Sequence, residues 1–260
     1  MATASSLGAP ALETVNLTDR VVVVSGDDTP LAAGIQRSLT SCGATVAAVR
    51  PTRGRPFDPR RLGDQVPLEL DLADRPTARD GLAGIADRHG RLDALVFAHV
   101  PTAAAEPRLM ADMTDEHWQA VWEDSMRAMI YALQGAYAQF RKASPPHGRV
   151  VVLIPALAMT GGPGYTATAA MAEGQRLMMK SVARQWGPEN ITANAVTVAN
   201  SAILPEAPDF EYSLAERALG RKGDPETDIG PVVSFLCSDA ARFVTGTTLF
   251  CEGGLWMTAI

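Results

Sequence analysis

The chain has 260 residues, of which 47% are hydrophobic and 20% are charged, values that are ordinary for a globular protein. Its net charge of −6 and its lack of any lysine or arginine block argue against binding to nucleic acid or to an anionic membrane surface. The three cysteines, Cys42, Cys237 and Cys251, have no close spacing, so we expect neither a disulfide framework nor a zinc site. This cysteine usage predicts a protein of the reducing cytoplasm.

The N-terminal stretch, residues 1–16, lacks the basic start and long apolar core of a signal peptide, and no apolar run reaches the roughly 20 residues of a membrane span. We therefore expect a flexible tail over 1–16, followed by one α/β domain over 17–260.

Short apolar runs alternate with longer helical patterns along this domain. The runs predict strands at 20–25, 44–49, 66–70, 92–97, 149–154, 191–198 and 247–251. The helical patterns lie at about 30–41, 75–88, 114–141, 164–186 and 226–238. Continuously apolar strands are typical of a sheet that is covered on both faces. The alternation predicts a Rossmann-like, doubly wound parallel sheet of about seven strands with helices on both faces.

Two segments break this alternation. Residues 50–64 have a loop-like Pro, Gly and Arg content where a helix often joins the second and third strands. Residues 199–225 are irregular, and such a segment after the sixth strand is suited to covering a ligand.

The first strand leads into the stretch "GDDTPLAAG", Gly26 to Gly34. Thr29 is suited to cap a helix that begins at Pro30. Asp27 and Asp28 would then lie near the positive end of that helix, where acidic groups are favourable. The residues of this stretch are therefore accounted for as the start of a helix.

Four segments carry a family resemblance: "GRKGDPETDIGPVVSFLCSDAARFVTGTTLFCEGGL" (220–255), "ARQWGPENITANAV" (183–196), "HWQAVWEDSM" (117–126) and "GRVVVLI" (148–154). Together they resemble the short-chain dehydrogenase/reductase family over about residues 17–257. The resemblance implies an oxidoreductase that uses NAD or NADP. It also implies a dimer or tetramer built on the helices at about 114–141 and 164–186.

The family's catalytic tyrosine is matched by Tyr165 in "GYTATAA". The lysine one helical turn later, which lowers the tyrosine pKa, is replaced by Ala169. The serine position falls on Pro155, or on Ile154 if the alignment shifts, and the asparagine position falls on Ser125. A tyrosine hydroxyl has an unperturbed pKa of about 10, so little phenolate forms at neutral pH without the lysine. We weigh a residual chemical role for Tyr165 against that of a partly buried structural aromatic.

The family's three glycines after the first strand fall on Gly26, Pro30 and Ala32. Pro30 has no N–H for a phosphate. A close like-charge pair costs roughly 4 kcal/mol at an effective dielectric near 20, whereas a helix N-terminus returns about 0.3–1 kcal/mol. Repulsion from Asp27 and Asp28 therefore outweighs the helix dipole, and we expect no bound cofactor.

Other cofactor positions are mixed. Asp71 matches an aspartate that contacts adenine, although it is equally suited to cap the next helix, and Arg50 at the end of the second strand would favour NADP over NAD. His99 lies in "LVFAHV" (95–100), in place of the family's Asn-Asn-Ala-Gly segment. It is either an acid/base at neutral pH or a hydrogen-bonded structural residue.

Three functions are compatible with these positions. The first is a degenerate, non-catalytic subunit that pairs with itself or with an active paralogue. The second is a cofactor-independent lyase, cyclase or isomerase that uses Tyr165. The third is a divergent NAD(P)-dependent oxidoreductase acting on a hydroxy or keto substrate.

Overall fold

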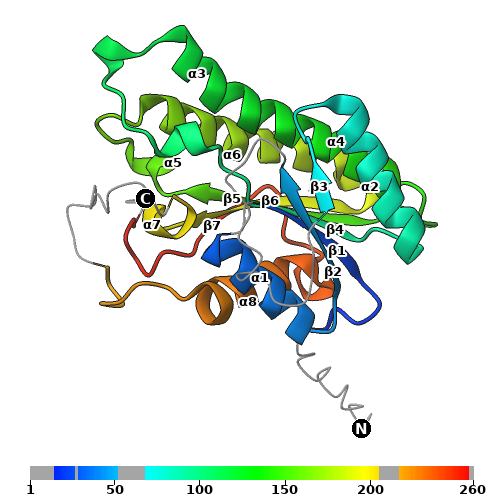
Figure 1. Ribbon diagram of the computed structural model, residues 1–260. Coiled ribbons are helices and arrows are strands. Elements are labelled where there is room, and N and C mark those ends of the chain that lie inside the picture. The colour runs from blue at the N-terminus through cyan, green and yellow to red at the C-terminus, as the bar shows by residue number, and fades with distance from the viewer. Residues whose placement is uncertain (1–14, 27–28, 52–67, 205–216, 258–260) are drawn as a thin grey trace, which may run out of the picture.

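A computed structural model describes residues 15–26, 29–51, 68–204 and 217–257. Seven parallel strands form one sheet in the order β3-β2-β1-β4-β5-β6-β7 (Figure 1). The order reverses between β1 and β4, which makes the sheet doubly wound. The predicted fold class and the number of strands are therefore confirmed.

The sheet is buried because its strands are almost continuously apolar. The strands are β1 (Val21–Ser25), β2 (Thr45–Pro51), β3 (Leu68–Leu70), β4 (Ala94–Phe97), β5 (Gly148–Pro155), β6 (Ile191–Val198) and β7 (Thr248–Phe250). Every residue of β1, β4, β5 and β6 is buried. This is the pattern expected of central strands that are covered on both faces.

Helices cover both faces of the sheet, with α1 and α8 on one side and α2, α4 and α6 on the other (Figure 1). The helices are α1 (Pro30–Ser41), α2 (Arg75–His89), α3 (Asp115–Trp122), α4 (Ala128–Phe140), α5 (Leu157–Thr160), α6 (Thr166–Trp186), α7 (Asn200–Ile203) and α8 (Gly230–Cys237). In the described part of the chain no helix has the length and apolar character needed to cross a membrane.

Two helix predictions differ from the structure. The helix expected at 114–141 is divided into α3 and α4 by a wider π-turn at Glu123–Arg127. The helix expected at 226–238 likewise begins with a π-turn at Pro225–Ile229 before α8. A π-turn is one wider i→i+5 turn inside a longer helical segment, and the apolar pattern of the flanking helical turns does not reveal it.

Both segments that we expected to be irregular lie partly outside the described residues. Of residues 50–64, only Arg50 and Pro51 are described, and both belong to β2. Residues 205–216 are also outside, and the described part of 199–225 contains the short helix α7, which we did not predict. Of the expected tail, only residues 15 and 16 are described.

Candidate functional site

The candidate site lies at the carboxyl edge of the sheet, where ligands bind in open α/β folds. Register places the end of β1 beside β4, with Ser25 opposite Phe97, and the end of β5 beside β6, with Pro155 opposite Val198. His99 follows β4 by two residues. The topology therefore gathers Gly26, His99 and Pro155 at one edge.

Tyr165 lies immediately before α6, and 1% of its surface is exposed. Its backbone N–H donates to the carbonyl of Gly162 at 3.0 Å, and its own carbonyl accepts from the N–H of Ala169 at 2.8 Å. Burial raises the pKa of Tyr165. The side chain one turn later is the methyl group of Ala169, which cannot counter this shift.

Hydrogen bonds hold the segment after β4 next to Tyr165. The backbone N–H of Arg108 donates to the carbonyl of Gly164 at 2.7 Å. The hydroxyl of Thr168 on α6 donates to the carbonyl of Ala104 at 2.8 Å. These bonds place the 3₁₀ turn Thr102–Ala105 and the residues after it next to the start of α6.

The serine position of the family lies at the buried end of β5. Pro155 is the last residue of the strand, and Ile154 before it is also buried, so neither alignment supplies a hydroxyl. The backbone N–H of Leu157 donates to Oδ1 of Asn200 at 3.0 Å. The loop after β5 is therefore held by an asparagine of α7.

Ser125 lies inside the π-turn, and its side chain is fully buried. Its hydroxyl donates to the carbonyl of Val121 at 2.5 Å and also approaches the carbonyl of Trp122 at 3.3 Å. The hydroxyl is thus used within its own helix. An amide at this position would also have offered a donor to neighbouring groups.

His99 contacts the same π-turn. Its Nε2 lies 2.9 Å from the carbonyl oxygen of Asp124, and because a carbonyl can only accept, Nε2 carries the hydrogen. Burial lowers the pKa of His99 to about 4, and the bond to Asp124 only partly opposes that shift. His99 is therefore neutral at physiological pH. A buried, hydrogen-bonded imidazole is what the structural alternative predicts, and the acid/base role of His99 stays a prediction.

The loop after β1 uses its polar groups internally. The N–H of Gly26 donates to the carbonyl of Val49 at 3.1 Å, and a Cβ at Gly26 would lie 3.3 Å from Cβ of Ala98. Thr29 caps α1 by accepting the N–H of Ala32 at 3.2 Å, and Pro30 is the first residue of the helix. These contacts agree with the helix start expected from the sequence. Asp27 and Asp28 lie outside the described residues.

The two remaining cofactor positions also have partners within the protein. Arg50 forms an ion pair with Glu69 of β3. Asp71 accepts the N–H of Ala73 through Oδ1 at 2.9 Å, and α2 is capped by Asp74, whose carboxylate accepts the N–H of Thr77 at 3.0 Å. Asp71 therefore holds the turn before α2, and the helix-capping role proposed for it belongs to Asp74.

Glu252, which the sequence reasoning missed, is the buried acid that follows β7. It is 3% exposed, and its Oε1 accepts the backbone N–H of Trp256 at 3.1 Å. Burial raises its pKa, against the opposing hydrogen bonds from Thr197 and Trp256. A single acidic residue inside the apolar stretch "TTLFCEGGLW" is the signal that could have identified it.

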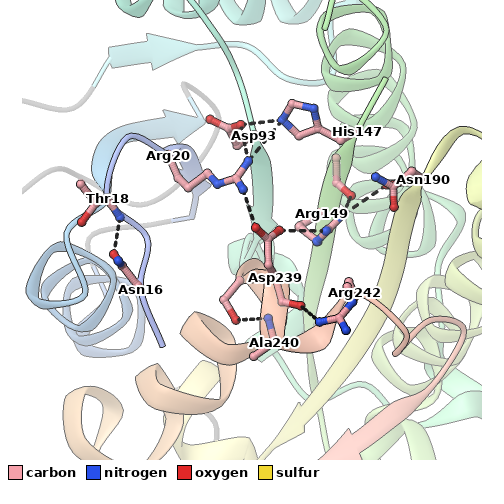
Figure 2. Close-up of polar contacts among 12 residues, drawn as sticks. Asn16, Thr18, Arg20, Asp93, His147, Arg149, Asn190, Asp239, Ala240 and Arg242 are labelled. Carbon is pink, nitrogen blue, oxygen red and sulfur yellow. Dashed lines mark hydrogen bonds and ion pairs between the residues drawn. The ribbon is translucent and has the colours of Figure 1, made fainter. Parts of the chain in front are cut away.

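A second polar cluster lies at the opposite, amino edge of the sheet (Figure 2). It joins Arg20, Asp93, His147, Arg149 and Asp239 through hydrogen bonds and ion pairs. Among the described residues no group of three or more His, Cys, Asp or Glu side chains could hold a metal ion.

A family model described as enoyl-(acyl carrier protein) reductase matches residues 27–256. The chain belongs to the short-chain dehydrogenase/reductase family. An L-rhamnose 1-dehydrogenase (NAD(P)(+)) from a Sphingomonas species is 28% identical, with 93% of this chain and 98% of that protein covered. A 3-oxoacyl-(acyl-carrier-protein) reductase from Thermotoga maritima is also 28% identical, with 93% and 99% covered.

A solved structure of a short-chain type dehydrogenase/reductase from Mycobacterium ulcerans superposes on this short-chain dehydrogenase/reductase with a TM-score of 0.78. It is 20% identical, with 92% of this chain and 90% of that chain covered. A likeness at this level of identity supports the fold, and the named relatives are dehydrogenases and reductases.

Proposed function

We propose that this short-chain dehydrogenase/reductase is a degenerate member that does not carry out ordinary hydride transfer and acts as a non-catalytic subunit of an oligomer. The observation that carries the proposal is the environment of Tyr165. Acid–base catalysis by this residue needs a lowered pKa, but burial raises it and Ala169 offers no cation. Positioned acid–base catalysis contributes roughly 10²–10⁴-fold, so its loss removes most of the family's chemistry.

The start of α1 supports the same proposal. A pyrophosphate at a helix N-terminus is held by backbone N–H groups of the first turn. Pro30 has no N–H, and that of Ala32 is already bonded to Thr29. These residues do not fit the dinucleotide that the family implies, and no reaction step is assigned to it.

The surface formed by α3 and α6 supports an oligomeric role. Trp118 and Trp122 stack with ring centroids 5.8 Å apart, and they are 37% and 38% exposed. Leu177 on α6 is 56% exposed, and Gly174 one turn earlier brings α6 close to Trp122. Clustered exposed aromatic residues are typical of association surfaces. The partner is a second copy of the chain or an active paralogue.

Titration with NADH and NADPH, followed by nucleotide fluorescence, tests the proposal. We expect no saturable binding of either nucleotide, and we expect the chain purified from its native host to be oligomeric. Micromolar binding of NADH or NADPH would overturn the proposal that the protein does not carry out hydride transfer. A monomeric chain would overturn the subunit role.

The names of the relatives favour a second candidate, a divergent NAD(P)-dependent oxidoreductase acting on a hydroxy or keto compound. Nucleotide binding in the titration would favour this oxidoreductase over the non-catalytic subunit.

A non-redox enzyme that uses Tyr165 is the remaining alternative. For any activity found, Tyr165→Phe separates these roles, with Tyr131→Phe as a control that removes a hydroxyl elsewhere. Unchanged turnover of Tyr165→Phe would remove Tyr165 from the mechanism.

A further inference from the structure

A groove lies between α2 and the end of the sheet formed by β2 and β3. Its volume is about 780 Å³, which is within the range of small-molecule sites. Its floor includes Val46, Ala48 and Leu70, and its wall includes Gly84 and Ile85 of α2. The groove is therefore largely apolar.

Nothing in the described part of the protein requires residue 84 to be a glycine for steric reasons. A Cβ at Gly84 would meet no heavy atom within 4 Å, whereas a Cβ at Gly81, also in the groove, would lie 2.4 Å from Leu70. Glycine inside a helix is less favourable than alanine. The missing side chain at Gly84 leaves the wall of the groove open.

The groove is polar at one end only. Thr45 begins β2, and Arg88 and His89 end α2, so these three lining residues lie toward the amino edge of the sheet. Leu68, which is 45% exposed, and Leu70 lie at the other end. Among the described residues, no acidic side chain lines the groove and Arg88 has no ion-pair partner.

Arg88 and His89 also complement the negative end of the α2 dipole, which is equivalent to about half a charge. The full charge of Arg88 exceeds that partial charge, so this end of the groove remains attractive to an anion. The opposite end offers only apolar contact.

We propose that this groove binds an aliphatic carboxylate, with its chain along β2 and β3 and its carboxylate beside Arg88. The apolar floor contributes because the aliphatic chain of the ligand is removed from water when it lies in the groove. A guanidinium suits a carboxylate because it can donate two parallel hydrogen bonds.

Calorimetric titration of the full chain with decanoate tests the site, with acetate and decanol as probes that lack the chain or the charge. Decanoate should bind saturably, acetate should not bind, and decanol should bind at least about fivefold more weakly than decanoate. Non-saturable decanoate binding, or equal affinity for decanol, would overturn the proposal.

Gly84→Leu should weaken decanoate binding at least about tenfold by filling the groove, and Arg88→Gln should weaken it about fivefold. Arg79 lies on the same helix outside the groove and is 66% exposed, so Arg79→Leu and Arg79→Gln are matched controls. The proposal fails if Gly84→Leu binds like the unsubstituted chain, or if the Arg79 variants lose as much affinity. Arg88→Gln changes an exposed residue and tests the site even if Gly84→Leu does not fold.

Discussion

At the scale of single residues, the burial of His99 makes the stability of the protein depend on pH. Its folded pKa of about 4 is below the unperturbed value of about 6.5, so the unfolded chain binds more protons between these values. The stabilisation is complete above about pH 6.5 and is lost as the pH falls toward 4. We expect the free energy of unfolding to decrease by up to about 3 kcal/mol across this window, measured by urea unfolding.

His99→Gln provides the test of that assignment. Glutamine keeps an N–H donor for the carbonyl of Asp124 but does not titrate, so the decrease between pH 6.5 and 4 should become smaller. His99→Phe removes the donor and should cost about 1–3 kcal/mol at pH 7, because a buried carbonyl loses its partner. An unchanged pH profile in His99→Gln would show that another group causes the decrease.

Glu252 has the opposite dependence on pH. Burial raises its folded pKa, so the folded state holds its proton to higher pH than the unfolded chain, and stability decreases as the pH rises above about 4.3. We expect Glu252→Gln to gain stability relative to the parent chain from pH 4 to pH 7 in thermal unfolding. Glu123→Gln, at an exposed helical ion pair, is the comparison that removes a carboxylate elsewhere. A parallel change in both variants would contradict the assignment.

Sequence reasoning reached some of these residues and not others. The alanine at position 169, where the family has a lysine, can be read directly from the sequence. The capping of α1 by Thr29 is also a local property, so neighbouring residues suffice to predict it. The partner of His99 depends on the π-turn 25 residues later, and the burial of Glu252 depends on how the C-terminal segment packs. Such contacts between distant segments have no signature in a single sequence.

At the scale of elements, the close packing of α1 against the π-turn before α8 depends on Gly34. A Cβ at Gly34 would lie 2.5 Å from Cβ of Pro225 and 2.7 Å from the backbone nitrogen of Glu226. Gly34→Ala should therefore destabilise the protein by about 1–3 kcal/mol, because backbone must move to admit the methyl group.

Gly84→Ala is the matched comparison, since it makes the same substitution inside α2 where nothing lies within 4 Å. It should stabilise the protein by about 0.5–1 kcal/mol through helix propensity and reduced freedom of the unfolded chain. Chemical denaturation of both variants measures the two effects. The explanation would be wrong if both variants moved stability in the same direction.

Element positions follow from the sequence where burial is complete. The strand predicted at 191–198 and the helix predicted at 30–41 have the same bounds in the structure. At the edge of the sheet, β7 covers only Thr248–Phe250 of the strand predicted at 247–251, and Phe250 is exposed. Apolar pattern therefore locates central elements well, whereas edges depend on neighbours that the pattern does not encode.

At the scale of the whole molecule, the two edges of the sheet carry different groups of side chains. The carboxyl edge holds the candidate site, and the amino edge holds the charged cluster that joins the starts of β1, β4 and β5 (Figure 2). Asp93 is the centre of one half of this cluster and is 3% exposed. Its carboxylate accepts hydrogen bonds from the N–H of Val21, from Arg91 and from His147, at distances of 2.6–2.8 Å.

Asp93→Asn should therefore destabilise the whole domain by about 3 kcal/mol, because removing one partner leaves buried groups without compensation. Burial alone would raise the pKa of Asp93, but the hydrogen bonds from Arg91, Val21 and His147 outweigh it and hold the pKa below its usual range. The stabilisation should be present above about pH 3.9 and should be lost as the pH falls through the lower folded value.

Urea unfolding of the parent chain and of Asp93→Asn from pH 3 to pH 8 measures this contribution. Asp80→Asn removes an acid whose ion pair with Arg79 is 66% exposed, and it should leave stability almost unchanged. The difference between the parent chain and Asp93→Asn should shrink at the acid end, because protonation of Asp93 removes the charge that the substitution removes. A constant difference down to pH 3 would mean that the carboxylate charge does not hold the amino edge together.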